Sequence, residues 1–178
     1  MVVGLLSLSR LSTEAQPFQQ MDLNRVVAEA LSDLEQKIRL SNATIDVSLL
    51  PVIEADPLQM RQLFQNLLGN AIKFQPPDAT PRVKISSSQT DSRFIQLLVQ
   101  DNGIGFDAQH ADQLFQPFRR FVGRSEYEGS GMGLAICRKI VERHNGEIIA
   151  VSQIDQGATF IVTLPVKQTN HKTFQENP

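Results

Sequence analysis

The apolar residues of this chain follow two spacings, one typical of helices and one typical of strands. Over residues 22–38 they recur every three or four positions, which predicts a helix lying on a core, with Asp22 as its N-cap. A second helix is predicted over 57–74, because an aspartate cap at Asp56 precedes a proline at the first helical position. Its apolar face should bury Leu58, Leu63, Phe64, Leu67, Leu68, Ala71 and Ile72.

A third helix and several short strands complete the pattern. The helix is predicted over 133–145, closed by Gly146 as its C-cap. Residues 16–20 break the periodicity and indicate a linker, and 155–157 indicate a turn. Alternating residues predict strands at 44–50, 52–55, 82–88, 93–100, 147–153 and 158–164. We therefore predict an α+β two-layer sandwich, in which three helices pack on one face of a mixed or mostly antiparallel sheet of about five strands.

Composition indicates a single domain with its own core. The 178 residues are 41% hydrophobic, which is enough for one such domain. A net charge of -2 leaves no basic excess to neutralise a phosphate backbone, so we expect no nucleic-acid partner. The single cysteine excludes an internal disulfide. Because no apolar run approaches the roughly 20 residues of a membrane helix, we expect a cytoplasmic domain without direct membrane insertion, whose parent protein could be membrane-anchored.

The first candidate for chemistry is the segment DNGIGFD at 101–107, which follows a predicted strand. The carboxylate of Asp101 can accept a hydrogen bond from an amine such as that of adenine. Gly103 and Gly105 would let a flat ring approach the backbone. Read in isolation, the same segment is also typical of an ordinary Asn-Gly turn.

A second glycine cluster, GSGMGL at 129–134, leads directly into the predicted helix over 133–145. Backbone N–H groups at a helix N-terminus can face an anion such as a phosphate. The cluster is not a P-loop, since no Gly-Lys-Ser/Thr follows, and not a dinucleotide fingerprint, since a polar loop precedes it. A tight helix entry without a ligand is the alternative.

Three polar residues share one face of the predicted helix over 57–74. Asn66 and Asn70 are four positions apart, and Lys73 lies three positions further on. A carboxamide oxygen suits Mg²⁺, and an ammonium group suits a phosphate oxygen. The alternative is that both asparagines point to solvent.

Between the two glycine clusters, residues 114–121 place three phenylalanines within seven positions. These rings either form a small hydrophobic cluster or adjoin a mobile lid over 122–130. Such a lid would be hinged by Gly123 and Gly129. The arginines that could reach phosphates from it are Arg119, Arg120 and Arg124.

From about residue 20 to 166, the chain resembles the catalytic, ATP-binding domain of bacterial sensor histidine kinases. This domain belongs to the GHKL or Bergerat-fold group, which includes gyrase B, Hsp90 and MutL. Four segments carry the resemblance in the family's order: NLLGNAIKF as its N box, DNGIGFD as its first glycine box, LFQPFRRF as its F box and GSGMGLAI as its second glycine box. The resemblance implies ATP and Mg²⁺ as cofactors.

The resemblance implies a role for each matching residue. Asp101 would bind the adenine amine, in a pocket shaped by Gly103 and Gly105. Phe115 and Phe118 would anchor the lid. The phosphates would be cradled by the second glycine box, and one further position would lie near the adenine; these residues are Gly129, Ser130, Gly131, Met132, Gly133, Leu134 and, by the adenine, Thr159.

The N box would supply the catalytic residues. Asn70 would be the Mg²⁺ ligand, Asn66 would support it, and Lys73 would contact a phosphate. ATPase members of the group carry a water-activating glutamate at the position of Asn66. Without a base to activate water, the γ-phosphoryl group should wait for a protein nucleophile, which favours the kinase branch.

Kinases of this class phosphorylate a histidine in a preceding helical-hairpin domain, and no histidine of this chain has that context. Residues 1–16 resemble the end of the hairpin's second helix, 17–166 the catalytic domain, and 167–178 a tail. We therefore predict a histidine kinase domain that does not autophosphorylate as an isolated chain. Its partners would be the hairpin domain and a response regulator. The alternative is a nucleotide-gated regulatory module of the same group without kinase chemistry.

Overall fold

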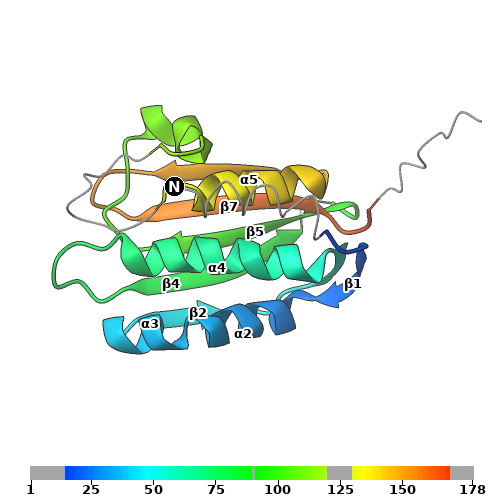
Figure 1. Cartoon of the computed structure of the whole chain (residues 1–178), viewed down its shortest axis with the longest axis horizontal. Coiled ribbons are helices and arrows are strands. Elements are labelled where there is room, and N and C mark those ends of the chain that lie inside the picture. The colour runs from blue at the N-terminus through cyan, green and yellow to red at the C-terminus, as the bar shows by residue number, and fades with distance from the viewer. Residues whose placement is uncertain (1–14, 90, 120–129, 169–178) are drawn as a thin grey trace, which may run out of the picture.

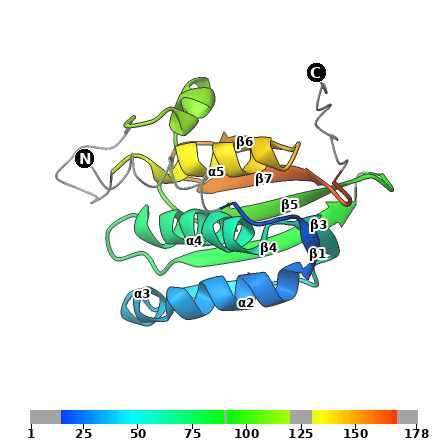
Figure 2. The ribbon, with the colours of Figure 1, turned by 45° about the vertical axis from the view of Figure 1, so that its right-hand side comes forward.

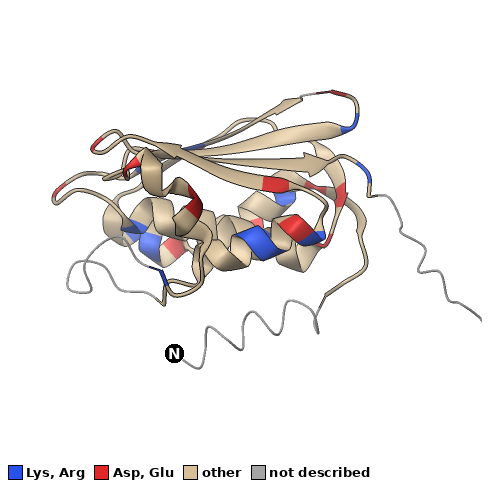
Figure 3. Ribbon diagram, turned by 90° about the horizontal axis from the view of Figure 1, so that it is seen from above, with Lys and Arg blue, Asp and Glu red and all other residues tan. Residues whose placement is uncertain are grey.

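The computed structural model describes residues 15–89, 91–119 and 130–168, and it shows a five-stranded sheet with helices on one face (Figure 1). Seen from above, strands and helices lie in two layers (Figure 3). The strands, in their order across the sheet, are β2 (Thr44–Val47), β4 (Arg82–Gln89), β5 (Phe94–Asp101), β7 (Ala158–Pro165) and β6 (Glu147–Ser152). The helices are α2 (Leu23–Asp33), α3 (Glu35–Ser41), α4 (Pro57–Lys73), α5 (Gly133–Arg143) and the 3₁₀ helix η1 (Ala108–Phe115).

The sheet is mixed, as predicted. β2 runs parallel to β4, whereas the β4–β5, β5–β7 and β6–β7 pairs are antiparallel. A parallel pair needs a long crossover, and the chain from β2 to β4 passes through α4. The antiparallel pairing of β5 with β7 places Gln100 opposite Thr159, so the end of β5 meets the start of β7. The predicted α+β sandwich is confirmed.

Alternate residues of the central strands face the helices and form the core. On β5 these are Ile95, Leu97 and Val99, each at most 3% exposed. One predicted core residue is wrong: Leu58 is 44% exposed. The first buried apolar residue of α4 is instead Met60, and a residue two positions earlier points to the other side of the helix.

The helix predicted over 22–38 is interrupted. Leu34 has φ -101° and ψ 4°, so α2 stops before it and α3 begins after it. Leu34 itself stays in the core at 7% exposure, while α3 contains no buried residue. The break therefore leaves Leu34 in the core, and the partly buried Ile38 of α3 still packs against that core.

Part of the predicted linker over 16–20 is a strand. β1 (Gln19–Asp22) pairs antiparallel with β3 (Val52–Ala55), forming a separate two-stranded sheet. Figure 2 shows the two strands together at the end of the molecule where α2 begins. Only Met21 of β1 is buried, so the segment has no apolar alternation to reveal it in the sequence.

The end of α5 also differs from the prediction. Asn145, with φ 55°, takes the left-handed position that was expected of Gly146. Asn145 and Gly146 then donate backbone hydrogen bonds to Glu142 (3.1 Å) and Val141 (3.0 Å), as in a Schellman motif. Gly146 is needed for another reason, since a Cβ there would lie 2.2 Å from the carbonyl oxygen of Thr163. Among the described helices, none has the length and apolar content to cross a membrane.

Candidate functional site

Asp101 ends β5 on the face that the helices cover, two positions after the buried Val99. Its Oδ1 accepts hydrogen bonds from the backbone N–H groups of Gly103 (2.8 Å) and Ala158 (3.1 Å). Within the described part of the chain, no group donates to its Oδ2. Burial raises the pKa of the Asp101 carboxyl, and the two N–H bonds oppose that shift. The two hydrogen bonds to Oδ1 therefore hold the carboxylate of this partly buried residue in place, and its Oδ2 remains available to a donor.

The loop after β5 approaches other backbones so closely that it requires glycine. A Cβ on Gly103 would lie 2.2 Å from the carbonyl oxygen of Phe74, and a Cβ on Gly105 would lie 2.2 Å from that of Gln153. Gly105 also has φ +63°, which disfavours other residues. The N–H of Ile104 donates to the carbonyl of Phe74 over 3.0 Å. The loop is thus fixed against the end of α4.

Two residues beside Asp101 escaped the sequence analysis. Gly157, with φ +76°, packs so tightly that a Cβ there would lie 2.0 Å from the backbone oxygen of Asp101. Ala158 supplies one of the two N–H groups that hold the carboxylate. The glycine in the predicted turn was the only local signal, because the contact joins residues 57 positions apart.

Asn66 lies in the middle of α4 and faces the first residue of α5. A Cβ on Gly133 would lie 3.2 Å from its Oδ1, tighter than most such contacts. The Nδ2 atom of Asn66 is buried and has no hydrogen-bond partner among the described residues. Met132 (1% exposed) and the partly buried Leu134 fix the start of α5 against the core. A buried donor of this kind needs an explanation, and a bound acceptor would supply one.

Asn70 and Lys73 follow Asn66 along α4 at intervals of about one turn, so the helix brings the three together as predicted. Both residues are partly exposed. The Nζ atom of Lys73 lies 4.0 Å from the centre of the Phe74 ring. A carboxamide oxygen and an ammonium group therefore lie on the surface of α4 beside the buried amide of Asn66.

The second glycine box is described from Ser130 onward, and Gly129 lies outside the described residues. Ser130 is exposed, and Gly131 has φ +70°. The carbonyl of Gly131 accepts a 3.2 Å hydrogen bond from the N–H of Phe118, which itself has φ 62°. The F box and the second glycine box thus meet through their backbones.

The two phenylalanines predicted to anchor a lid differ in their surroundings. Phe115 is 3% exposed, packs edge-to-face on Phe160 at 6.4 Å, and lies beneath the guanidinium of Arg138 at 4.5 Å. Phe118 is 46% exposed. The lid prediction falls on residues 122–130, of which only Ser130 is described; its hinges and two of its arginines therefore lie outside the described residues, namely Gly123, Gly129, Arg120 and Arg124.

Thr159 does not join the other predicted residues. It alternates with the core residues Ala158 and Phe160, so its side chain lies on the outer face of the sheet, away from the helices. There its Oγ1 accepts a 3.5 Å hydrogen bond from Gln100. Thr159 therefore lies on the face of the sheet opposite Asp101, whereas the N–H of its neighbour Ala158 donates to the Asp101 carboxylate.

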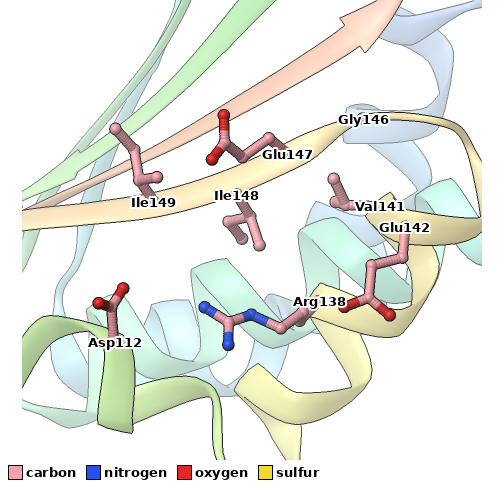
Figure 4. A pocket seen from close by; sticks show the side chains of 8 residues that line it. All are labelled: Asp112, Arg138, Val141, Glu142, Gly146, Glu147, Ile148 and Ile149. Carbon is pink, nitrogen blue, oxygen red and sulfur yellow. The ribbon is translucent and has the colours of Figure 1, made fainter.

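A cavity of about 230 Å³ lies elsewhere, between η1, α5 and the edge strand β6. Arg138 extends from α5 toward Asp112 of η1 across this space (Figure 4). Its lining residues are Asp112, Arg138, Val141, Glu142, Gly146, Glu147, Ile148 and Ile149. None of the residues predicted to bind the nucleotide or the metal lines this cavity, so it is separate from the site around Asp101 and Asn66.

Comparisons with known proteins agree on one family. The model described as histidine kinase-, DNA gyrase B- and HSP90-like ATPase matches residues 55–168. Cyanobacterial phytochrome A of Nostoc sp. strain PCC 7120 is 42% identical over 166 residues, which are 93% of this chain and 21% of that protein. The chain thus spans about a fifth of the length of the curated relatives it matches first.

Solved structures give the same result for the fold. The nucleotide-free catalytic domain of histidine kinase ThkA is 26% identical with a TM-score of 0.72, covering 86% of this chain and 100% of that one. Full-length ShkA in complex with AMPPNP is 25% identical with a TM-score of 0.78, covering 94% and 35%. ThkA in complex with response regulator protein TrrA is 27% identical with a TM-score of 0.66, covering 84% and 42%.

Proposed function

We propose, from the premise that the chain belongs to the family of histidine kinase-, DNA gyrase B- and HSP90-like ATPases, that it binds Mg-ATP and transfers the γ-phosphoryl group to a histidine of a hairpin domain. The resemblance to histidine-kinase catalytic domains drawn from the four sequence boxes is confirmed by the family model and by the solved kinases. The binding of AMPPNP by ShkA supports ATP as the ligand, and the complex of ThkA with TrrA supports a response regulator as a further partner.

One observation carries the proposal: Oδ2 of Asp101 is a half-buried acceptor with no donor among the described residues. An acceptor in this setting suits a ligand N–H group, and the adenine amine is such a donor. Gly103 and Gly105 let the loop after β5 pack against the backbones of Phe74 and Gln153, which fixes this loop beside the Asp101 carboxylate.

The phosphates would lie at the start of α5. The unpartnered Nδ2 of Asn66 would donate to a phosphate oxygen, and the N–H groups that begin α5 would face the same anion. The carboxamide oxygen of Asn70 would hold Mg²⁺, which neutralises phosphate charge when bound. Lys73 would contact a phosphate oxygen from the next turn.

The residues favour transfer to a protein over hydrolysis. The amide of Asn66 cannot take a proton from water, so it cannot act as the base of an ATPase. A neutral imidazole nitrogen would attack the γ-phosphorus while the bond to the β–γ bridging oxygen breaks and ADP leaves. His144 is unsuited to this role, because it is 0% exposed and both ring nitrogens are hydrogen-bonded to backbone groups. In the histidine kinases that the chain resembles, the acceptor histidine lies on the hairpin domain, and we assign the same acceptor here.

Calorimetric titration with Mg-ATP tests the base site. Asp101→Asn retains an acceptor for Gly103 and Ala158 but places an amide donor where the adenine amine would donate. We expect its affinity to fall at least about tenfold, the effect of losing one hydrogen bond of roughly 1.4 kcal/mol. Asp46→Asn makes the same chemical change at an exposed position of β2 and should leave affinity unchanged. Equal affinities for all three proteins would refute the assignment.

Incubation with γ-labelled ATP tests the reaction. We expect acid-labile label on a separately supplied histidine-kinase hairpin domain, and none on this chain alone. Binding without transfer to the hairpin would indicate a nucleotide-gated regulatory module instead. Steady phosphate release without the hairpin would indicate an ATPase.

A further inference from the structure

The segment just before β1 is held by an ion pair that lies far from the nucleotide site. The N–H of Gln16 donates to Oδ2 of Asp56 over 2.7 Å, and the carbonyl of Gln16 accepts from Nη2 of Arg143 over 2.8 Å. Arg143 also donates through Nη1 to the same Oδ2, over 2.9 Å. The backbone N–H of Gln16 is thus bound by Asp56 and its backbone carbonyl by Arg143. These two side chains also form an ion pair with each other. We call this arrangement the Gln16 clamp.

The clamp is built into the ends of two helices. Asp56 is 0% exposed, and its other oxygen, Oδ1, caps α4 by accepting from the N–H of Gln59. Arg143, in the last turn of α5, donates to Oε1 of Gln59 over 2.8 Å as well. This buried carboxylate holds its partners in one geometry, because losing Arg143 would leave a buried charge without its ion pair.

The next residues continue the attachment. The ring of Phe18 lies 4.9 Å from that of His144 and 4.6 Å from the guanidinium carbon of Arg143. β1 then pairs with β3, at the right-hand end of the molecule in Figure 1. Residues 16–22 are therefore attached to the domain continuously, by charge, by ring contact and by strand pairing.

The clamp and the candidate nucleotide site lie on the same two helices. α4 runs from Asp56 past Asn66, and α5 runs from Gly133, beside Asn66, to Arg143. Along each helix the Gln16 clamp is ten residues from Asn66 or Gly133, which is about 15 Å at 1.5 Å per residue. Because both are built on α4 and α5, any movement of Gln16 relative to these helices also changes its position relative to the proposed phosphate site.

We infer that Asp56 and Arg143 are positioning residues, which fix the direction in which the preceding chain leaves the ATP-binding fold and so align it with a phosphoacceptor hairpin. The inference rests on the proposed function, in which that hairpin precedes this domain. Neither residue is among those proposed to bind the nucleotide. Their effect is confined to transfer within one covalent protein, where the chain entering at Gln16 decides how the two domains meet.

Hydrogen exchange of the Gln16 amide, followed by NMR on the full chain, tests the clamp itself. We expect Arg143→Gln and Asp56→Asn to accelerate its exchange at least about tenfold, while asparagine still caps α4. Lys139→Gln removes the same charge from the exposed face of α5 and should change nothing. A Gln16 amide that exchanges equally fast in all four proteins overturns the clamp, whatever the reaction is.

Phosphorylation rates then test the positioning role, with a hairpin domain joined in front of residue 1 of the full chain or supplied separately. We expect Arg143→Gln to slow labelling of the joined hairpin about tenfold, since small misplacements strongly reduce transfer rates. The KM for ATP and the labelling of a separate hairpin should stay as in the wild type, and Arg143→Lys should recover part of the rate. Equal slowing in both arrangements overturns the positioning role. Failure of the proposed function is distinguishable, because the wild type itself would then label neither hairpin.

Discussion

Asp56 and His144 meet in the core, where the backbone N–H of Asp56 donates a 3.0 Å hydrogen bond to Nε2 of His144. Because Nε2 accepts this bond, the ring proton lies on Nδ1, which donates to the carbonyl of Ile140 over 2.7 Å. Both residues are 0% exposed. A neutral imidazole at the C-cap of α5 therefore accepts a hydrogen bond from the N-cap residue of α4.

This link predicts a pH dependence of stability. Burial lowers the pKa of His144 from 6.5, the hydrogen bond to Ile140 opposes this, Arg143 reinforces it and Asp56 opposes it. Between pH 6.5 and the lowered pKa, His144 binds a proton in the unfolded chain but not in the folded one. The free energy of unfolding therefore decreases as the pH falls through this range. We expect His144→Gln, which keeps an acceptor for Asp56, to show a smaller drop in the free energy of unfolding between about pH 7 and 5 in urea. Parallel pH profiles for the two proteins would contradict the assignment.

Asp101 should show a conflict between stability and binding. Burial raises the pKa of the Asp101 carboxyl in the folded protein. The charged carboxylate therefore lowers stability above this raised pKa, and the cost disappears as the pH falls through the raised pKa. We expect Asp101→Asn to raise the Tm of the nucleotide-free chain at about pH 7 by roughly 2–4 °C, the shift that 1 kcal/mol produces at this size. The gain should shrink as the pH falls through this raised pKa, because the wild-type carboxyl then becomes protonated. A lower Tm at neutral pH would show that the carboxylate stabilises the fold.

Two glycines should respond oppositely to alanine. At Gly157, with φ +76°, a Cβ would lie 2.0 Å from the backbone oxygen of Asp101. We expect Gly157→Ala to lower the free energy of unfolding by about 1–3 kcal/mol and to weaken nucleotide binding by moving the turn. At Gly69, inside α4, a Cβ would meet nothing within 4 Å. Gly69→Ala should stabilise the chain by up to about 1 kcal/mol, the helix-propensity difference between the two residues. Denaturant titration measures both.

Asn66 should be needed for the ligand and not for the fold. Its Nδ2 is buried without a partner among the described residues, so removing the amide removes an unpaired polar group as well as packing. We expect Asn66→Ala to change Tm by less than about 3 °C, near 1 kcal/mol, while Mg-ATP affinity falls at least about tenfold. Gln62→Ala, one turn earlier on α4, is the matched control for both measurements. Loss of stability without loss of affinity would assign Asn66 to the fold.

Local signals predicted those features that neighbouring residues decide. Asp56 followed by Pro57 predicted the start of α4, and the side chain of Asp56 does accept from Gln59. The i, i+4 spacing placed Asn66 and Asn70 on one face of that helix. Alternation predicted the central strands, whose inward residues are buried. Each of these features depends on hydrogen bonds or side-chain directions within a few positions.

The features that the sequence did not predict depend on residues far away in the chain. β1 exists because it pairs with β3, and the outward direction of Thr159 follows from the register between β7 and β5. The break at Leu34 divides the predicted helix into α2 and α3 while the side chain of Leu34 stays in the core. None of these alters the apolar periodicity near the residue concerned.

By itself, the sequence determined the α+β class, the helix that bears Asn66, Asn70 and Lys73, and the two glycine-rich segments of the family to which the chain belongs. Only the tertiary structure decided which atoms meet: Ala158 on the carboxylate of Asp101, and Asp56 and Arg143 on the backbone of Gln16. The physical reason is distance along the chain. Caps and periodicity arise from neighbours, whereas a carboxylate acquires distant partners only after strand register and helix packing have brought them within hydrogen-bonding reach.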